Sequence, residues 1–277
     1  MKKRIIICAD DFAQNEAISE GIVRLADKQR INAISCLVNA PLWFDVSQQL
    51  EHLKSSSLQG LHFNLTFGSP LSTQWARHEG AQFPSLSRLL IASFSRRLRR
   101  DCVEAELEAQ LDGFVSRTSR LPDFIDGHQH IHQFPVIREA LLAVYAKRNL
   151  SCFLRATSNG WRDLTSVNQF PKSQLIAALG GMTFKQRLRE SAIRCNASFS
   201  GIYNFNKAPH FTDYFRHFLK ESQDGGLIMC HPGLVSQDKT DPQYPYRHYE
   251  YDYFMSNDFL QDLRDNACEL SHKESKV

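Results

Sequence analysis

The sequence lacks the features of a membrane-spanning, secreted or disulfide-bonded protein. No apolar run in its 277 residues approaches the ~20 residues that cross a bilayer, and the apolar stretch at 5–9 is too short for a secretory signal. The seven cysteines include no CxxC pair, which is typical of reduced thiols. We therefore expect a soluble cytoplasmic protein without a membrane span.

The sequence also lacks a large charge of either sign. The formal net charge is +3, which is too small to predict a nucleic-acid-binding surface, because such a surface needs a clustered basic stripe. One arginine-rich stretch lies at 96–100, and glutamates follow it at 104, 106 and 108 in an expected helix. We therefore expect a solvated or ion-paired face at this stretch and no nucleic-acid partner.

What the chain has is an alternation of short apolar runs and helical patterns. Hydrophobic residues make up 42% of it, enough for a sizeable core, and no repeat, low-complexity tract or clear boundary divides it. We expect strands at 5–9, 33–38, 61–65, 124–125, 151–156, 201–205 and 226–230. We expect helices at 16–29, 43–54, 87–117, 135–147, 172–179, 185–195, 210–222 and 254–267, with loops at 68–84 and 241–253.

This alternation predicts a parallel sheet with both faces covered, as in an α/β protein built on a (β/α) barrel. We expect a single domain over residues 1–270, followed by a polar tail at 271–277. The pattern weakens over 157–200, which we interpret as a possible insertion that shapes the substrate cleft.

The most informative feature is a pair of neighbouring carboxylates, Asp10 and Asp11, at the end of the apolar run 5–9. In a parallel sheet the chemistry collects at the carboxyl ends of the strands, so two acids at this point indicate a site. A second interpretation stays open, in which Asp11 or Asn15 caps the following helix and Asp10 is a solvated loop residue.

Histidines in two short apolar segments are the second informative feature. Strand alternation places His62 opposite its apolar neighbours, and His128, His130 and His132 share a parity that an extended backbone would aim at one side. One carboxylate with two or three imidazoles can hold a catalytic divalent metal and leave a position for water. Alternatively, His62 is a hydrogen-bonded core residue. If the chain leaves the strand after Asp126, only one or two of the three histidines face the ion.

All the candidate chemical groups share one position in this scheme, the carboxyl end of a predicted strand. In a (β/α) barrel these ends converge on one mouth, so residues distant in sequence become neighbours there. The groups are Asp10, Asp11, His62, Asp126 with His128, Arg155 and His231.

Four segments in this order carry a further signal: ADDF at 9–12, GLHFNLT at 60–66, DGHQHIH at 126–132 and MCHP at 229–232. With them the chain resembles the YdjC-like family, which includes chitooligosaccharide deacetylases and a hopanoid-associated deacetylase. The resemblance implies a distorted (β/α) barrel of the polysaccharide-deacetylase type with one divalent metal ion. It implies Asp11, His62 and His128 as metal ligands. It also implies Asp10 as general base and His231 as a candidate general acid.

Two departures limit what the resemblance implies. The family commonly has glycine after Asp-Asp-Phe, where this chain has Ala13. The stretch 157–200 matches no motif, and we expect substrate choice to depend on it. The resemblance therefore supports the class of reaction better than the substrate.

The implied chemistry is metal-assisted hydrolysis of an N-acetyl amide. A bound divalent metal, with Mg or Zn favoured, lowers the pKa of water from about 15.7 towards 7 and polarises the amide carbonyl. We expect Asp10 to take the water proton, Arg155 to bind Asp10 through charge-assisted hydrogen bonds, and His231 to protonate the leaving amine. Two other interpretations remain open, in which Arg155 is an ordinary ion-pair partner and His231 is a turn residue. In the second case His130 and His132 are the next candidates for the general acid.

The expected substrate is a small N-acetylated saccharide or the headgroup of a glycolipid. A metal-dependent phosphoesterase and a non-catalytic sugar-binding or lipid-headgroup-binding protein are the alternatives. The first usually needs more metal ligands than the strand ends supply. A non-catalytic binding protein does not need a second carboxylate beside the one that binds the ligand. The tyrosine-rich stretch 241–253 suits sugar packing as well as a packed loop, and a homo-oligomer is possible.

Overall fold

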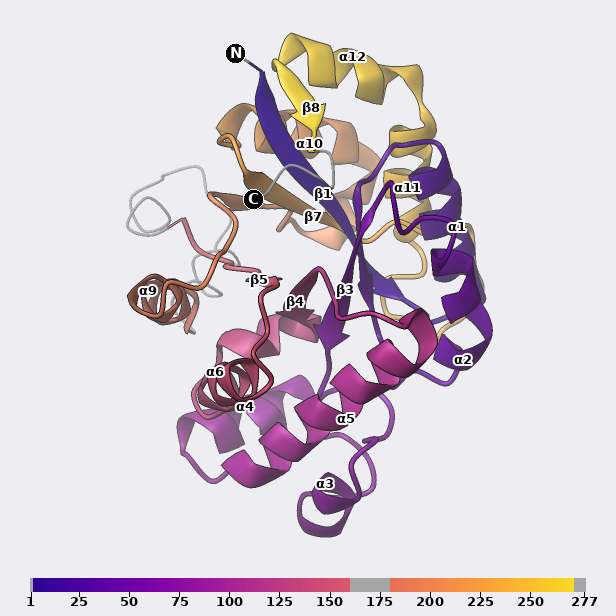
Figure 1. Cartoon of the computed structure of the whole chain (residues 1–277). Helices are drawn as coiled ribbons and strands as arrows, with labels where there is room; N and C mark the ends of the chain where they lie inside the picture. The colour runs from indigo at the N-terminus through magenta and orange to yellow at the C-terminus, as the bar shows by residue number, and fades with distance from the viewer. Residues whose placement is uncertain (1, 160–179, 272–277) are drawn as a thin grey trace.

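The protein is described from a computed structural model that covers residues 2–159 and 180–271 (Figure 1). Its centre is a parallel sheet with the strand order β5-β4-β3-β2-β1-β7-β6, and β8 pairs with the start of β1. The strands are β1 (Lys3–Phe12), β2 (Ala33–Cys36), β3 (Leu58–Phe63), β4 (Phe124–Gly127), β5 (Phe153–Leu154), β6 (Phe199–Ser200), β7 (Gly226–Cys230) and β8 (Cys268–Leu270).

Helices surround this sheet (Figure 1). The α-helices are α1 (Glu16–Asp27), α2 (Trp43–Val46), α3 (Thr73–His78), α4 (Leu86–Phe94), α5 (Arg100–Thr118), α6 (Ile137–Lys147), α9 (Met182–Glu190), α10 (Phe211–Glu221), α11 (Arg247–Met255) and α12 (Asn257–Asp265). The short 3₁₀ helices are η1 (Ser47–Leu50), η2 (His128–Gln133) and η4 (Phe205–His210). In the described part of the chain, no helix combines the length and apolar character that a bilayer crossing needs.

Apolar side chains pack on both faces of the curled sheet. Alternation along β1 places Ile5 and Ile7 in the large core that includes the helices, and Ile6 and Cys8 in a smaller core. The smaller core holds side chains from strands on both sides of β1, with the rings of Phe124 and Phe153 stacked at 5.2 Å. The curled sheet therefore encloses its own core and forms a half-barrel. The predicted class, a single-domain α/β protein with a distorted (β/α) barrel, is confirmed.

Two asparagine side chains bridge the two ends of the sheet near β5 and β6. Asn196 accepts from the backbone N–H of Ala156 at 2.8 Å and donates to its carbonyl at 2.9 Å. Asn159 makes the same pair of contacts with Phe199, at 2.7 and 3.0 Å. Because a side-chain amide carries the same donor and acceptor as a peptide group, the two asparagines pair backbone groups that a further strand would pair.

The predicted strand at 201–205 is wrong, because the sixth strand, β6, ends before it. Gly201 has a φ of +112°, and a Cβ there would lie 2.1 Å from the carbonyl oxygen of Met229. Only glycine allows this approach to the neighbouring strand, and the chain turns out of the sheet at this residue.

Two predicted helices are each divided into two. The helix expected at 87–117 consists of α4 and α5, separated by a turn in which Arg96 has a φ of 55°. The helix expected at 254–267 contains only the last two residues of α11, followed by α12, and Ser256 between them caps α12 by accepting from the N–H of Phe259. The predicted loop at 241–253 is therefore helical from Arg247 onward.

The predicted loop at 68–84 contains the short helix α3. Ser72 caps it by accepting from the N–H groups of Gln74 and Trp75, and the Trp75 side chain is buried in the core. The helix expected at 172–179 lies outside the described residues, as does most of the tail at 271–277, and the stretch 157–200 is described only in part. Of the arginine-rich stretch, Arg96, Arg99 and Arg100 form exposed ion pairs.

Candidate active site

A β-bulge at the end of β1 aims both of its carboxylates into the site. Ala9 pairs with Ile34 and Phe12 with Cys36, so β1 has one residue more than β2 between these pairs. Asp11 takes up the extra length with a φ of 71°. Neighbouring strand residues normally point to opposite faces, and the bulge removes that restriction from Asp10 and Asp11. The cap of α1 is Asn15, which accepts from the N–H of Ile18, so Asp11 is not needed for capping.

Ala13, at the position where the family commonly has glycine, also has a left-handed backbone, with a φ of 76°. Glycine adopts this conformation without strain, whereas alanine does so at a cost of ~1–2 kcal/mol. The departure from the family motif thus leaves the path of the backbone compatible with the site, and both carboxylates stay in place.

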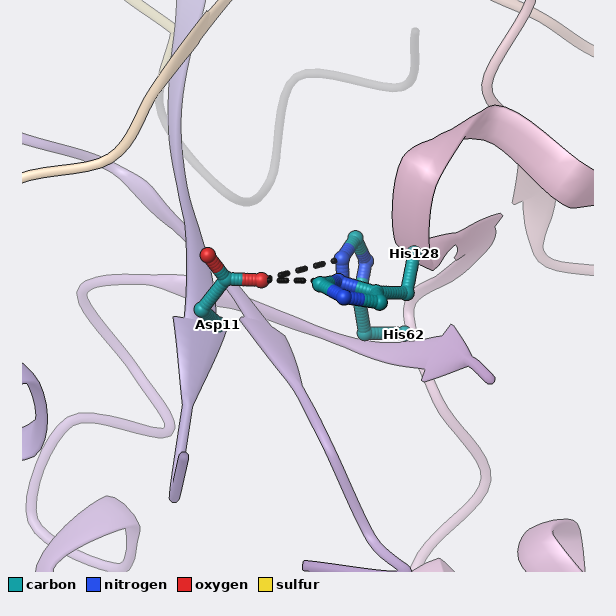
Figure 2. A group of neighbouring side chains, drawn as sticks. All are labelled: Asp11, His62 and His128. Carbon is teal, nitrogen blue, oxygen red and sulfur yellow. Dashed lines mark hydrogen bonds and ion pairs between the residues drawn. The ribbon is translucent and has the colours of Figure 1, made fainter. Parts of the chain in front are cut away.

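Asp11, His62 and His128 converge although they come from β1, β3 and the residue after β4 (Figure 2). The Oδ1 atom of Asp11 lies 3.0 Å from Nδ1 of His128 and 3.5 Å from Nε2 of His62. One donor atom from each residue lies within 4.8 Å of the other two. One carboxylate oxygen and two imidazole nitrogens are a donor set that suits a catalytic divalent metal, so these residues fit the expected ion.

The protonation of these residues follows from their burial and partners. Burial opposes a charge on His62, but the carboxylates of Asp126 and Asp10 outweigh it and raise the pKa of this ring to about 10. Burial likewise opposes a charge on Asp11, and Arg247 together with the two histidines lowers the pKa of that carboxyl well below its usual range. A metal ion at this point would take the place of the His62 proton, because a ligating imidazole must be neutral.

Asp126 lies directly across from His62 in the ladder between β4 and β3. Its Oδ1 atom accepts from Nδ1 of His62 at 2.7 Å and from the Ser35 hydroxyl at 2.6 Å. This contact holds the His62 ring so that Nε2 points at Asp11. The sequence placed Asp126 at a strand end but predicted no role for it.

We expect Asp126→Asn to weaken metal binding by about 10- to 100-fold, the usual effect of removing a carboxylate that orients a ligating histidine. The dissociation constant of the metal, measured by competition with a chelating dye, tests this. Ser35→Ala removes a hydroxyl that contacts Asp126 at 2.6 Å and Nδ1 of His62 at 2.9 Å but keeps the carboxylate, so it should have a smaller effect. Unchanged affinity in Asp126→Asn would mean that packing and the Ser35 contact orient His62 without this carboxylate.

Arg155, fully buried just after β5, joins the two halves of the site. Its guanidinium contacts both carboxylate oxygens of Asp10 at 2.6 Å and Oδ2 of Asp126 at 2.6 Å. Burial opposes its charge, but the two carboxylates keep its pKa well above the usual value. Cys8, Asp10 and Asp126 also lie close enough together for a metal, but Arg155 contacts all three, so a cation already occupies their centre.

The three histidines at 128–132 do not share a side, because the chain leaves the strand at Gly127. Gln129 and His130 have left-handed backbones, with φ of 54° and 60°, and the segment forms η2. Of the three, only His128 joins the cluster with Asp11, while His130 lines the cavity described below. His132 is buried and contacts the carbonyl of Arg155 through Nε2 at 2.9 Å, which removes it as a candidate acid.

His231 follows β7 and lies at the cavity, with its ring edge against Phe205 at 5.4 Å between centroids. Its backbone N–H donates to the buried carboxylate of Glu250 at 2.6 Å. Burial lowers the pKa of the His231 ring to about 4, so the ring is neutral at neutral pH. The same effect raises the pKa of Glu250 to about 7. Glu250 therefore holds the backbone at His231, directly after β7.

Arg247 is a residue of the site that the sequence analysis missed. It is buried at the start of α11, and its Nη2 atom donates to Oδ2 of Asp11 at 2.8 Å. It also binds Asp241 through two contacts of 2.6 and 3.1 Å. Since Oδ2 of Asp11 is held by Arg247, Oδ1 is the oxygen that faces His62 and His128 (Figure 2). Arg247 lies in a tyrosine-rich stretch with no motif around it, so its role at the site could not be predicted from the sequence.

These residues lie at a cavity of about 540 Å³. Asp10, Asp11, His62 and His128 are among its lining residues, as are His130, His231 and Arg247. The remainder of the lining is partly polar, from residues such as Gln14, Thr66 and Gln243, and partly apolar. The cavity is large enough for a small-molecule substrate.

Fold and site together define an α/β half-barrel protein with a candidate centre for one metal ion at the carboxyl ends of its strands. Residues 4–265 match the model of the YdjC-like protein family. The chain belongs to the YdjC-like family, as the four sequence motifs indicated.

Curated relatives of the chain carry deacetylase names. A carbohydrate deacetylase of Mus musculus is 32% identical over 151 residues, which cover 50% of this chain and 47% of that protein. A chitooligosaccharide deacetylase of Yersinia pestis is 27% identical over 260 residues, which cover 89% of this chain and 88% of that protein. The chain spans about half the length of the first relatives that it matches, with 46% for the carbohydrate deacetylase of Danio rerio.

Solved structures share the fold. A putative cellobiose-phosphate cleavage protein of Enterococcus faecalis superposes with a TM-score of 0.69 at 19% identity, covering 99% of both chains. A peptidoglycan N-acetylglucosamine deacetylase superposes with a TM-score of 0.51 at 9% identity, covering 98% of this chain and 86% of the other. At these identities the likeness concerns the architecture alone.

Proposed function

We propose that the protein is a metal-dependent hydrolase that removes the acetyl group from an N-acetylated sugar. The observation that supports this proposal is that two neighbouring carboxylates, Asp10 and Asp11, have different partners. Asp11 faces two imidazoles in a metal donor set, while Asp10 beside it is bound by a guanidinium and still lines the cavity. A binding protein needs the first group but not the second. The deacetylase names of the relatives support the same reaction class.

The proposed ligands are Asp11, His62 and His128, and the ion is Mg or Zn. When bound, the ion would polarise the acetamide carbonyl and lower the pKa of water. Arg247 keeps one Asp11 oxygen engaged and so orients the other. Asp126 has the same effect on His62, through Nδ1.

Asp10 is the proposed general base. Arg155 holds its carboxylate through two contacts of 2.6 Å, which fix its orientation at the cavity. A carboxylate oxygen can accept more than one hydrogen bond, so Asp10 can still take a proton from the attacking water. The water oxygen then adds to the acetyl carbon, and the amide bond between this carbon and the nitrogen breaks, so that the nitrogen stays on the sugar.

His231 is the proposed source of the proton that the leaving amine needs. Its ring is neutral before the reaction, since burial holds its pKa near 4. For this role it must gain a proton during the reaction, and for the reaction to balance, a proton taken from the attacking water must reach the leaving amine. Atoms balance in this scheme: water and the N-acetyl sugar give acetate and the free amine.

The test of the proposed function is acetate release from N-acetylglucosamine, chitobiose and chitotriose. The protein is first stripped with a chelator and then supplied with Mg²⁺ or Zn²⁺ in separate reactions. We expect acetate from at least one sugar with one of the metals and none from the stripped protein. Hydrolysis of a phosphate monoester without any acetate release would support a phosphoesterase instead, and metal-dependent sugar binding without turnover would support the non-catalytic alternative.

The role of His231 has its own test. His231→Ala should slow the hydrolysis of an acetamide far more than that of an activated acetate ester, because a good leaving group departs without a proton. The two kcat/KM values, each relative to the wild type, measure the difference. Equal losses on both substrates would assign His231 to substrate positioning, and His130 would then be the next candidate acid at the cavity.

A further inference from the structure

The cavity has an apolar wall on the side of His128. Phe67, Leu86, Leu90 and Phe134 line it, and none of these side chains can form a conventional hydrogen bond. The wall begins close to the proposed metal centre, where the ring of Phe67 meets the edge of His128 at 6.4 Å between centroids. It therefore lies within reach of a substrate whose acetyl group is at the centre.

The helix α4 extends this wall to the surface of the molecule. Leu86, Leu90 and Phe94 are spaced four apart and lie along one face of the helix. The adjacent face, with Leu89, packs into the core. The Phe94 side chain is 44% exposed, and its ring lies 6.1 Å from that of Phe134. A continuous apolar strip thus leads from the cavity outward.

Sugar rings alone do not account for this strip. Each sugar hydroxyl that leaves water needs a new hydrogen-bond partner, and the apolar side chains of this wall supply none, so burying hydroxyls there is costly. The cavity lining also contains polar residues, such as Gln14, Thr66 and Gln243, that can serve a sugar. The cavity therefore offers two surfaces of different chemistry, one for hydroxyl groups and one for hydrocarbon.

We propose that the substrate is an N-acetylated sugar with a hydrocarbon aglycone, and that this aglycone lies along Leu86, Leu90 and Phe134 towards Phe94. The inference rests on the proposed function and names the substrate class of the same site. Burial of the hydrocarbon against these side chains supplies binding energy in proportion to the apolar area that both surfaces remove from water.

The experiment uses a series of N-acetylglucosaminides with methyl, butyl, hexyl and octyl aglycones, kept below their micelle concentrations. We expect kcat/KM for acetate release to rise with chain length by about two- to fourfold per methylene, the upper value corresponding to the ~0.8 kcal/mol of a fully buried methylene. Chitobiose and chitotriose are measured in parallel as substrates that extend the sugar without hydrocarbon.

Two variants of α4 test whether the dependence of kcat/KM on chain length arises at the apolar wall. Leu90→Ser should flatten the dependence of kcat/KM on chain length. Ile91→Ser is the matched control, because this neighbouring side chain is 64% exposed and is not among the cavity-lining residues. It should keep the wild-type dependence. If the melting curve shows that Leu90→Ser is unfolded, Leu86→Gln takes its place.

The outcomes separate this inference from the proposed function. Equal kcat/KM from methyl to octyl in the wild type, with faster turnover of longer chitooligosaccharides, would overturn the inference and leave the proposed function intact. If no substrate releases acetate, the proposed function fails. The binding affinities of the octyl and methyl glycosides, measured by calorimetry, then test the inference independently of turnover. Tighter octyl binding in the wild type but not in Leu90→Ser supports it, and equal binding overturns it.

Discussion

Asp10→Asn is expected to retain its metal ion and to lose acetate release by about 10² to 10⁴ in rate, the usual contribution of a general base. An asparagine keeps the size of the side chain but cannot accept a proton from water. Asp10 is also not part of the cluster of Asp11, His62 and His128, so that donor set stays complete. Metal content by elemental analysis and kcat on an N-acetylated sugar, measured on the same preparation, test both halves of the prediction.

Asp11→Asn is the matched control, since it makes the same chemical change at the neighbouring residue. It removes the carboxylate that faces both histidines, and we expect it to lose metal and activity together. If Asp10→Asn lost the metal while Asp11→Asn retained it, the roles of the two residues would be reversed. Because Arg155 contacts Asp10 through both oxygens, the melting temperature of Asp10→Asn must be compared with the wild type.

Removal of either histidine ligand should strip the ion. In His62→Ala and in His128→Ala, two donors of the proposed set remain, and we expect metal content well below one ion per chain after dialysis, with acetate release lost in parallel. Elemental analysis of the dialysed proteins is the measurement. Wild-type metal content in both variants would show that the ion is held elsewhere.

His130→Ala serves as the control for these two variants. It lies in the same short segment as His128 and also contributes to the cavity, but it is not part of the cluster around Asp11. We expect it to keep its metal. Loss of the ion in His130→Ala as well would mean that the whole turn after β4, rather than the His128 ligand alone, maintains the site.

The classification as an α/β barrel could be predicted because it depends on local patterns. The run at 5–9 indicates a strand buried on both faces, and the alternation of such runs with helical spacing indicates a parallel sheet. The rule that the carboxyl ends of strands meet at one mouth then brought Asp11, His62 and His128 together correctly, although 117 positions separate the first from the last.

Where the sequence analysis failed, a backbone conformation or a close approach decided the outcome. The turn at Gly201 depends on the short distance between its Cα and the carbonyl of Met229 on the neighbouring strand. The spacing of residues along the sequence does not reveal this distance. The left-handed residues Gln129 and His130 direct His128 and His132 to different places, whereas parity along an extended strand predicted one side. Non-glycine residues adopt such conformations only when surrounding contacts impose them.

The chain by itself determined which residue types stand at the strand ends, and its resemblance to the YdjC-like family implied which of them are the candidate metal ligands and base. Only the tertiary structure decided how they are held. Arg247 reaches Asp11 across 236 positions, and Asp126, for which no role was predicted, reaches His62 across 64. Such contacts have no period or spacing in the sequence, because they depend on where folding places two distant segments. The same applies to the apolar wall on α4, where the helical pattern marks an apolar face but does not reveal that part of it lines the cavity.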